Sequence, residues 1–170
     1  GILLNDTILV QNVRQVTNLS VNNLNIADLT GIEGFVALEQ LNCALNSLNT
    51  LDLSNNTALT ALWCQNNQLT NLDLRQNTVL TTLRCQYNQL STLDISDNHN
   101  LTHLTCVNNQ FTTLDLRNGN NTILLNANFL CANNLDLYCI DVDDSVWSAN
   151  NWTNIDPQHT FSTNCPGGNG

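Results

Sequence analysis

The sequence contains no lysine and no methionine, and its four basic residues, all arginines, stand against 14 acidic residues. A formal net charge of −10 lacks the basic footprint that a phosphate backbone requires, which excludes nucleic acid as a partner. No apolar run approaches the roughly 20 residues that span a bilayer, and the negative charge disfavours anionic membrane surfaces. We therefore expect no nucleic-acid partner and no membrane insertion.

The dominant feature that is present is a 21-residue repeat, which aligns without gaps over four blocks. A degenerate fifth block begins at Leu125, and residues 16–38 form a divergent first repeat. A period of this length is typical of a solenoid. About six coils, each advancing roughly 4.8 Å, predict a rod close to 30 Å long. The four regular blocks begin at Leu41, Leu62, Leu83 and Leu104.

Each block contains the phrase LxxLxLxxNxL twice, with cysteine in one of the leucine positions. Alternation with a period of two places Leu62 and Cys64 in the core and Trp63 outside. The second phrase likewise turns Leu72 inward and Asp73 outward. We therefore predict two short parallel strands on opposite walls of each coil, and little helix.

These motifs resemble the bacterial leucine-rich-repeat family, specifically its nested 21-residue class, sometimes called IRREKO repeats. The resemblance covers nearly the whole chain and implies a mainly β leucine-rich-repeat solenoid. Residues 24–43 look like the first repeat of secreted Bacteroidetes-type members, which implies a short helix over 32–38. Residues 139–165 look like the C-terminal cap of the same proteins.

The resemblance also suggests how the chain is divided. Residues 1–15 are too short for the amphipathic capping helix of the family, so we expect a partial N-terminal cap there. The repeats are expected over 16–137, and the C-terminal cap and tail over 138–170. Such proteins are secreted or displayed on the cell surface.

Seven cysteines divide into a periodic set and three others. The periodic cysteines are expected to stack as a column of buried thiols, because cysteine packs as a small hydrophobe. A four-thiolate metal site is the alternative, but a straight column cannot surround one ion. Cys139 and Cys165 flank the cap, and we predict a disulfide between them, which implies an oxidising compartment. Cys131 is expected to be a buried free thiol. The periodic set is Cys43, Cys64, Cys85 and Cys106.

Two columns of asparagine also follow the repeat. We expect their amides to point inward and to satisfy donors and acceptors of the backbone at each bend. The first column is Asn46, Asn67, Asn88 and Asn109. The second is Asn56, Asn77 and Asn98, and the register breaks it at Gly119.

Outward positions that differ between coils are free to serve a ligand, whereas positions that are the same in every coil serve the coil. On the cysteine-bearing strands such positions gather tryptophan, tyrosine and arginine, the residue types enriched in binding hot spots. The alternative is that isolated surface aromatics are ordinary. The same register places Leu124, Asn126 and Asn128 outward in the fifth block. The expected binding residues, for a protein or carbohydrate ligand, are Trp63, Arg84, Tyr87, His103 and Thr105.

The opposite wall carries a column of aspartates at about 4.8 Å spacing, which must repel one another. Arg75 and Arg117 lie two residues along and relieve part of the repulsion, so stability is expected to rise with salt and to fall if Arg75 is removed. Calcium is an open alternative, but we favour a solvated face without a cofactor. The DVDD segment at 141–144 has a spacing similar to that of a calcium loop, but we favour an N-cap for a short helix over 145–149. The column is Asp52, Asp73, Asp94, Asp115 and Asp136.

No catalytic set is apparent in the sequence. His103 has no acid at a fixed neighbouring position, and the chain lacks a G-x-S-x-G elbow and a phosphate-binding glycine loop. We therefore predict a non-catalytic extracellular module for recognition or adhesion. The alternative is a structural or self-associating scaffold that forms homo-oligomers. Such a scaffold domain could also be appended to a secreted enzyme.

Overall fold

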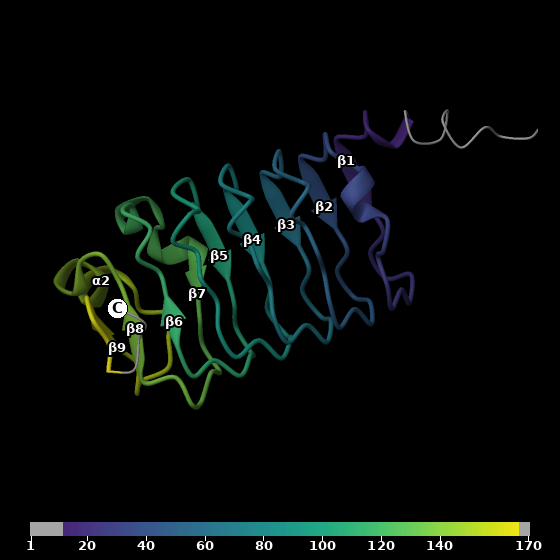
Figure 1. Ribbon diagram of the computed structural model, residues 1–170. Coiled ribbons are helices and arrows are strands. Elements are labelled where there is room, and N and C mark those ends of the chain that lie inside the picture. The colour runs from purple at the N-terminus through teal and green to yellow at the C-terminus, as the bar shows by residue number, and fades with distance from the viewer. Residues whose placement is uncertain (1–11, 167–170) are drawn as a thin grey trace, which may run out of the picture.

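A computed structural model describes residues 12–166 and shows a solenoid of stacked coils (Figure 1). Six short parallel strands form one continuous wall in the order β1-β2-β3-β4-β5-β7. The pairing keeps the 21-residue register from β2 to β5, so that equivalent residues of successive coils lie side by side. The strands are β1 (Asn18–Ser20), β2 (Gln40–Asn42), β3 (Ala61–Trp63), β4 (Thr82–Arg84), β5 (His103–Thr105) and β7 (Phe129–Leu130).

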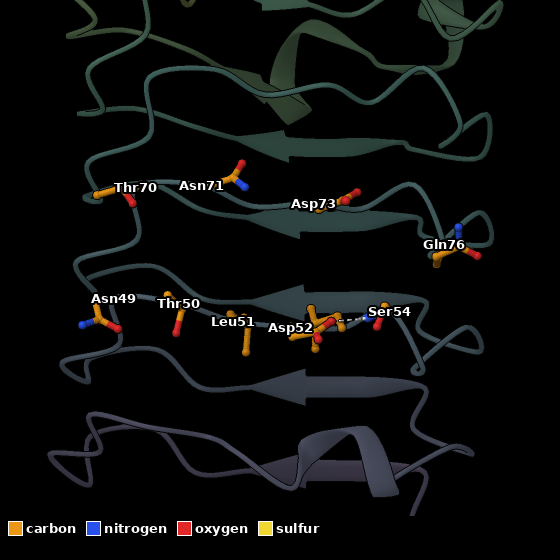
Figure 2. Close-up of a pocket in the computed structure, with 10 residues that line it drawn as sticks. Asn49, Thr50, Leu51, Asp52, Ser54, Thr70, Asn71, Asp73 and Gln76 are labelled. Atoms are coloured by element: carbon orange, nitrogen blue, oxygen red, sulfur yellow. Dashed lines mark hydrogen bonds between the residues drawn. The ribbon is translucent and has the colours of Figure 1, made fainter.

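The opposite wall is a sheet only at its C-terminal end, where β6 (Leu114–Asp115), β8 (Cys139–Asp141) and β9 (Thr160–Ser162) pair in parallel. An isolated bridge joins Asp94 to Asp115. The prediction of two strands in every coil is therefore wrong for the earlier coils. There a groove of about 340 Å³ lies between the chain at 49–54 and at 70–76 (Figure 2), which leaves no continuous ladder.

The core consists of the inward leucines and the cysteine column, as the alternation predicted. Leu41, Leu62, Leu83 and Leu104 are fully buried, as are the four periodic cysteines. Helix is confined to short segments. The helix expected over 32–38 is only the 3-10 turn η1 (Ile32–Gly34), because Gly31 before it is left-handed and Phe35 leaves the helical region.

The fifth repeat is longer than the sequence register assumed. Leu104 pairs with Phe129, an interval of 25 residues instead of 21, because the 3-10 helices η2 (Asn121–Ile123) and η3 (Asn126–Asn128) fill the added length. Leu124, Asn126 and Asn128 therefore do not continue the outward columns, and Leu124 is buried. Cys131 is buried and free, as expected, and follows Cys106 as a fifth member of the cysteine column.

The longer interval also makes the predicted last member of the aspartate column wrong. Asp115 pairs with Asp141, and Asp136 does not belong to the column. Asp141 is buried, and its carboxylate accepts a 2.7 Å hydrogen bond from the backbone N–H of Cys165. A residue assigned to the cap by sequence thus continues the wall.

The first asparagine column ties neighbouring coils together. Asn67 Nδ2 donates to the carbonyl oxygens of Cys43 and Cys64, at 3.1 and 3.0 Å, and its Oδ1 accepts from the N–H of Leu48 at 3.0 Å. Asn88 repeats this arrangement one coil on, and Asn134 extends the column after Asn109. Both halves of the amide are therefore used, as predicted.

The second column departs from the expectation in two ways. It does not end at Gly119, because Asn118 Nδ2 donates to the carbonyl of Asn98 at 3.1 Å. Within residues 12–166, the buried Oδ1 atoms of the inner members have no hydrogen-bond partner, so these amides act as donors only. Those members are Asn56, Asn77 and Asn98.

The C-terminal segment covers the open end of the core. Cys139 and Cys165 form the predicted disulfide, with their Cα atoms 5.8 Å apart. Helix α2 (Ser145–Asn151) begins at Asp144, whose side chain accepts from two backbone N–H groups of the first turn. Trp152 is buried against Phe129, with ring centroids 4.5 Å apart, and seals the last coil. The partial N-terminal cap expected over 1–15 falls largely outside the described residues.

Candidate functional site

The outward face of the six-stranded sheet carries four of the five predicted binding residues on three adjacent strands. Trp63 of β3 pairs with Arg84 of β4, and Arg84 pairs with Thr105 of β5, so the three form one row across the sheet. His103 lies in the neighbouring outward column, beside Thr82. Because parallel strands lie about 4.8 Å apart, these side chains are direct neighbours.

The side chains of this row are accessible to a ligand. Arg84 and His103 are exposed, whereas Trp63 and Thr105 are half-buried. The Nδ1 atom of His103 lies 2.9 Å from the Thr102 hydroxyl, which orients the imidazole on the surface. The row and the neighbouring column together present an indole ring, a guanidinium and an imidazole on a hydrogen-bonded sheet.

Tyr87, the fifth predicted residue, lies in the turn after β4 and has a left-handed backbone, with φ of 57°. Leu45 occupies the equivalent turn after β2, with φ of 58°. Asparagine tolerates this conformation, whereas leucine and tyrosine pay a steric cost of roughly 1 kcal/mol or more. Both side chains are about half exposed, at 51% for Tyr87 and 52% for Leu45. Elsewhere the same column holds Asn66, Asn108 and Asn133.

Two exposed hydrophobic side chains at strained positions are not explained by folding, since asparagine fills the same position elsewhere. Backbone strain of this kind is a recognised mark of functional surfaces. Leu45 is therefore a candidate that sequence reasoning missed. The signal was present in the repeat, where leucine and tyrosine interrupt a column of asparagines.

The aspartate wall is organised by local hydrogen bonds. Oδ1 of Asp52 accepts from the N–H of Ser54 at 3.0 Å, and Oδ1 of Asp73 accepts from the N–H of Arg75 at 3.1 Å. Arg75 also forms an ion pair with Asp73, and Arg117 forms one with Asp115 at 2.6 Å. The hydrogen bonds from the Arg75 side chain and backbone lower the pKa of Asp73 to about 2.

Each aspartate therefore has a structural task at its turn. Figure 2 shows Asp52 and Asp73 on neighbouring coils beside the groove. Within residues 12–166, no group of three or more histidine, cysteine or acidic side chains is arranged to hold a metal ion. The wall thus presents negative charge, and local hydrogen bonds hold its aspartates at the turns.

The thiols of the cysteine column are unreactive in the folded protein. Burial raises the pKa of Cys43 to about 12, and burial also raises the pKa of Cys64 and Cys85 well above the ordinary range. Thiolates are the reactive form, so these thiols are poor nucleophiles and poor metal ligands in the folded protein.

Comparisons with known proteins agree with this architecture, although no family model matches the chain. A 52-residue stretch is 46% identical to internalin J of Listeria monocytogenes serotype 4b (strain F2365); it spans 31% of this chain and 6% of that protein. The solved functional domain of InlJ from Listeria monocytogenes, described as including a cysteine ladder, is 38% identical with a TM-score of 0.65. That match covers 78% of this chain and 31% of the InlJ domain.

A second solved structure, an internalin (inlF) from the same Listeria strain, is 19% identical with a TM-score of 0.52 and shares the fold alone. It covers 78% of this chain and 49% of that structure. The fold defines the chain as a leucine-rich-repeat domain. More particularly, it is a bacterial leucine-rich-repeat protein related to the Listeria internalins. The chain spans under a third of the internalin J domain it matches.

Among residues 12–166, no helix is long and apolar enough to cross a bilayer.

Proposed function

We propose that the chain is an extracellular recognition or adhesion module, which binds a protein or glycan ligand through the outward face of the six-stranded sheet. The proposed contact residues are the five predicted from the sequence, together with Leu45 in the turn after β2. They are Leu45, Trp63, Arg84, Tyr87, His103 and Thr105.

One observation carries the proposal: Leu45 and Tyr87 expose hydrophobic side chains at left-handed positions where asparagine would fold better. They lie in the turns that follow β2 and β4, the two strands on either side of β3, which carries Trp63. Tryptophan, tyrosine and arginine are the residue types enriched in binding hot spots. The inward positions, in contrast, are nearly uniform leucine and cysteine.

We also propose a more specific relationship. The doubled LxxLxLxxNxL phrase supports membership of the nested 21-residue class, and the 139–165 segment supports a cap of the Bacteroidetes type. The Cys139–Cys165 disulfide supports a secreted or cell-surface location, because such bonds persist in oxidising compartments.

A screen of arrayed glycans and cell-surface proteins tests the proposal, with the wild-type chain compared with Trp63→Ala. Gln68→Ala, an exposed substitution in the next turn, serves as the matched control. The proposal predicts a ligand that is retained by Gln68→Ala and lost by Trp63→Ala at unchanged solution mass. Failure to bind any ligand, together with a defined oligomer in solution, would instead establish the self-associating scaffold.

A further inference from the structure

A hollow of about 300 Å³ lies at the N-terminal end of the same face. Its walls are the outward side chains of β1 and β2, the half-buried Leu19 and the side chain of Trp63. The hollow exists because the row that contains Trp63 has short side chains on this side, in the order Ser20, Asn42, Trp63. One side of the indole is therefore left open toward β1. The polar lining residues are Asn18, Ser20, Gln40 and Asn42.

No charged side chain lines this hollow, although the chain carries 18 charged residues, 4 basic and 14 acidic. Some polar atoms are already used: Asn18 Nδ2 donates to the Thr17 hydroxyl, and Asn42 Oδ1 accepts from the N–H of Ala44. Within residues 12–166, Asn18 Oδ1, Asn42 Nδ2 and the whole amide of Gln40 form no hydrogen bond. The hollow therefore offers both donors and acceptors and no ionic partner.

We propose that this hollow is a subsite for a neutral carbohydrate, with the sugar ring packed on Trp63. The inference rests on the proposed function in that it assumes this face binds a ligand. The C–H face of a pyranose is apolar and packs on an indole, whereas its hydroxyl groups both donate and accept. The lining amides of Asn18, Gln40 and Asn42 match those hydroxyls.

Size and charge both favour a neutral sugar over other ligands. A volume of about 300 Å³ lies at the lower limit of ordinary ligand pockets, which fits one or two rings rather than a protein loop. An acidic sugar would meet a net charge of −10 with no arginine in the lining. The geometry thus selects uncharged saccharides.

The test is an NMR titration of the ¹⁵N-labelled protein with neutral monosaccharides and disaccharides, followed at the tryptophan indole N–H signals. The Trp63 signal is assigned by its loss in Trp63→Phe. We expect a saturable shift of Trp63 with one sugar class, while Trp147 and the buried Trp152 stay fixed. Gln40→Ala should weaken binding about tenfold. The matched control Gln89→Ala, exposed and away from the hollow, should leave it unchanged.

Three results would overturn the inference: no neutral sugar shifts Trp63, Gln40→Ala binds as well as Gln89→Ala, or a sialylated sugar binds as tightly as its neutral counterpart. Failure of the sugar site is distinguishable from failure of the proposed function. A protein ligand that depends on Arg84 and Tyr87, found without any sugar binding, would remove the sugar subsite alone. Loss of both would remove the recognition surface as well.

Discussion

The side-chain amide of Asn67 donates to the carbonyl of Cys43 in the preceding coil at 3.1 Å, while it also holds the carbonyl of Cys64 in its own coil. Asn67→Ala leaves the buried N–H of Leu48 without a partner and removes one of the two amide hydrogen bonds that each carbonyl accepts, since Asn46 also donates to Cys43 and Asn88 to Cys64. It should therefore cost about 1–3 kcal/mol of unfolding free energy. Urea unfolding measures the loss. Gln68→Ala, exposed in the same turn, should change stability little, and an equal effect of both substitutions would contradict the structural role of the column.

Replacement of Tyr87 by asparagine should stabilise the fold and weaken ligand binding. The left-handed backbone at φ 57° costs tyrosine roughly 1 kcal/mol that asparagine largely avoids, as at Asn66 and Asn108. Thermal or urea unfolding gives the stability, and the ligand found by the array screen gives the affinity. A Tyr87→Asn protein that is less stable than wild type would show that the tyrosine serves the fold.

The ion pair between Asp73 and Arg75 should contribute to the dependence of the unfolding free energy on pH in the acid range. The folded pKa of Asp73, about 2, lies below the unfolded value near 3.9. The stabilisation is therefore complete above about pH 4 and is lost as the pH falls toward 2. Arg75→Gln should raise the pKa of Asp73 toward its ordinary value, which a carboxyl NMR titration measures. Arg84→Gln, on the other wall, should not.

Added salt, like Arg75, should reduce the repulsion between the aspartates of this wall. Screening weakens the repulsion along the aspartate column, so added salt should raise the unfolding free energy of the wild type, and more strongly that of Arg75→Gln. Unfolding measured at low and high ionic strength gives the answer. A wild type that is destabilised by salt would mean that attractive pairs outweigh repulsion on this wall.

The cysteine column predicts alkaline sensitivity. The pKa of Cys43 is raised to about 12 by burial, whereas an unfolded thiol titrates near 8.5. The contribution is complete below about pH 8.5 and is lost as the pH rises toward 12. The five free thiols should resist a thiol reagent in the native state and all react after unfolding. Rapid native labelling would contradict the buried column.

The disulfide should stabilise the C-terminal end. Joint replacement of Cys139 and Cys165 by serine opens a loop with a sequence separation of 26 and should cost about 3 kcal/mol. Selective reduction followed by hydrogen exchange should show the loss first at β8 and β9, since β8 carries Cys139 and the bond ties Cys165 against Asp141. Uniform destabilisation of all coils would argue against a local seal.

The sequence predicts the regular coils well because every rung repeats the same contacts: Leu62 and Cys64 are buried, and Trp63 turns outward. It fails where the repeat changes length. The interval from Leu104 to Phe129 hides two 3-10 helices, which carry no periodic signal. Strand content on the aspartate wall also escapes prediction, because the pattern fixes which side chains point inward but not whether adjacent coils come close enough to bond.

The position of the candidate face could be predicted from the sequence. The outward position of Trp63 and Arg84 holds a different residue in each coil, whereas the inward positions beside it are the same. Leu45 visibly interrupts a column of asparagines in the repeat, but the left-handed backbone that makes leucine costly there, with φ of 58°, is known only from the structure. The hollow beside Trp63 likewise depends on the shortness of Ser20 and Asn42 in the adjacent strands, and β1 lies in the divergent first repeat.

The most direct test of the recognition surface is a residue-by-residue map of ligand contact over the whole molecule, by NMR cross-saturation from the ligand found in the array screen. The account predicts that the affected amides lie on β3, β4, β5 and the turns at Leu45 and Tyr87, with the aspartate wall silent. Contacts centred instead on Asp52 and Asp73, or on the cap around α2, would contradict it.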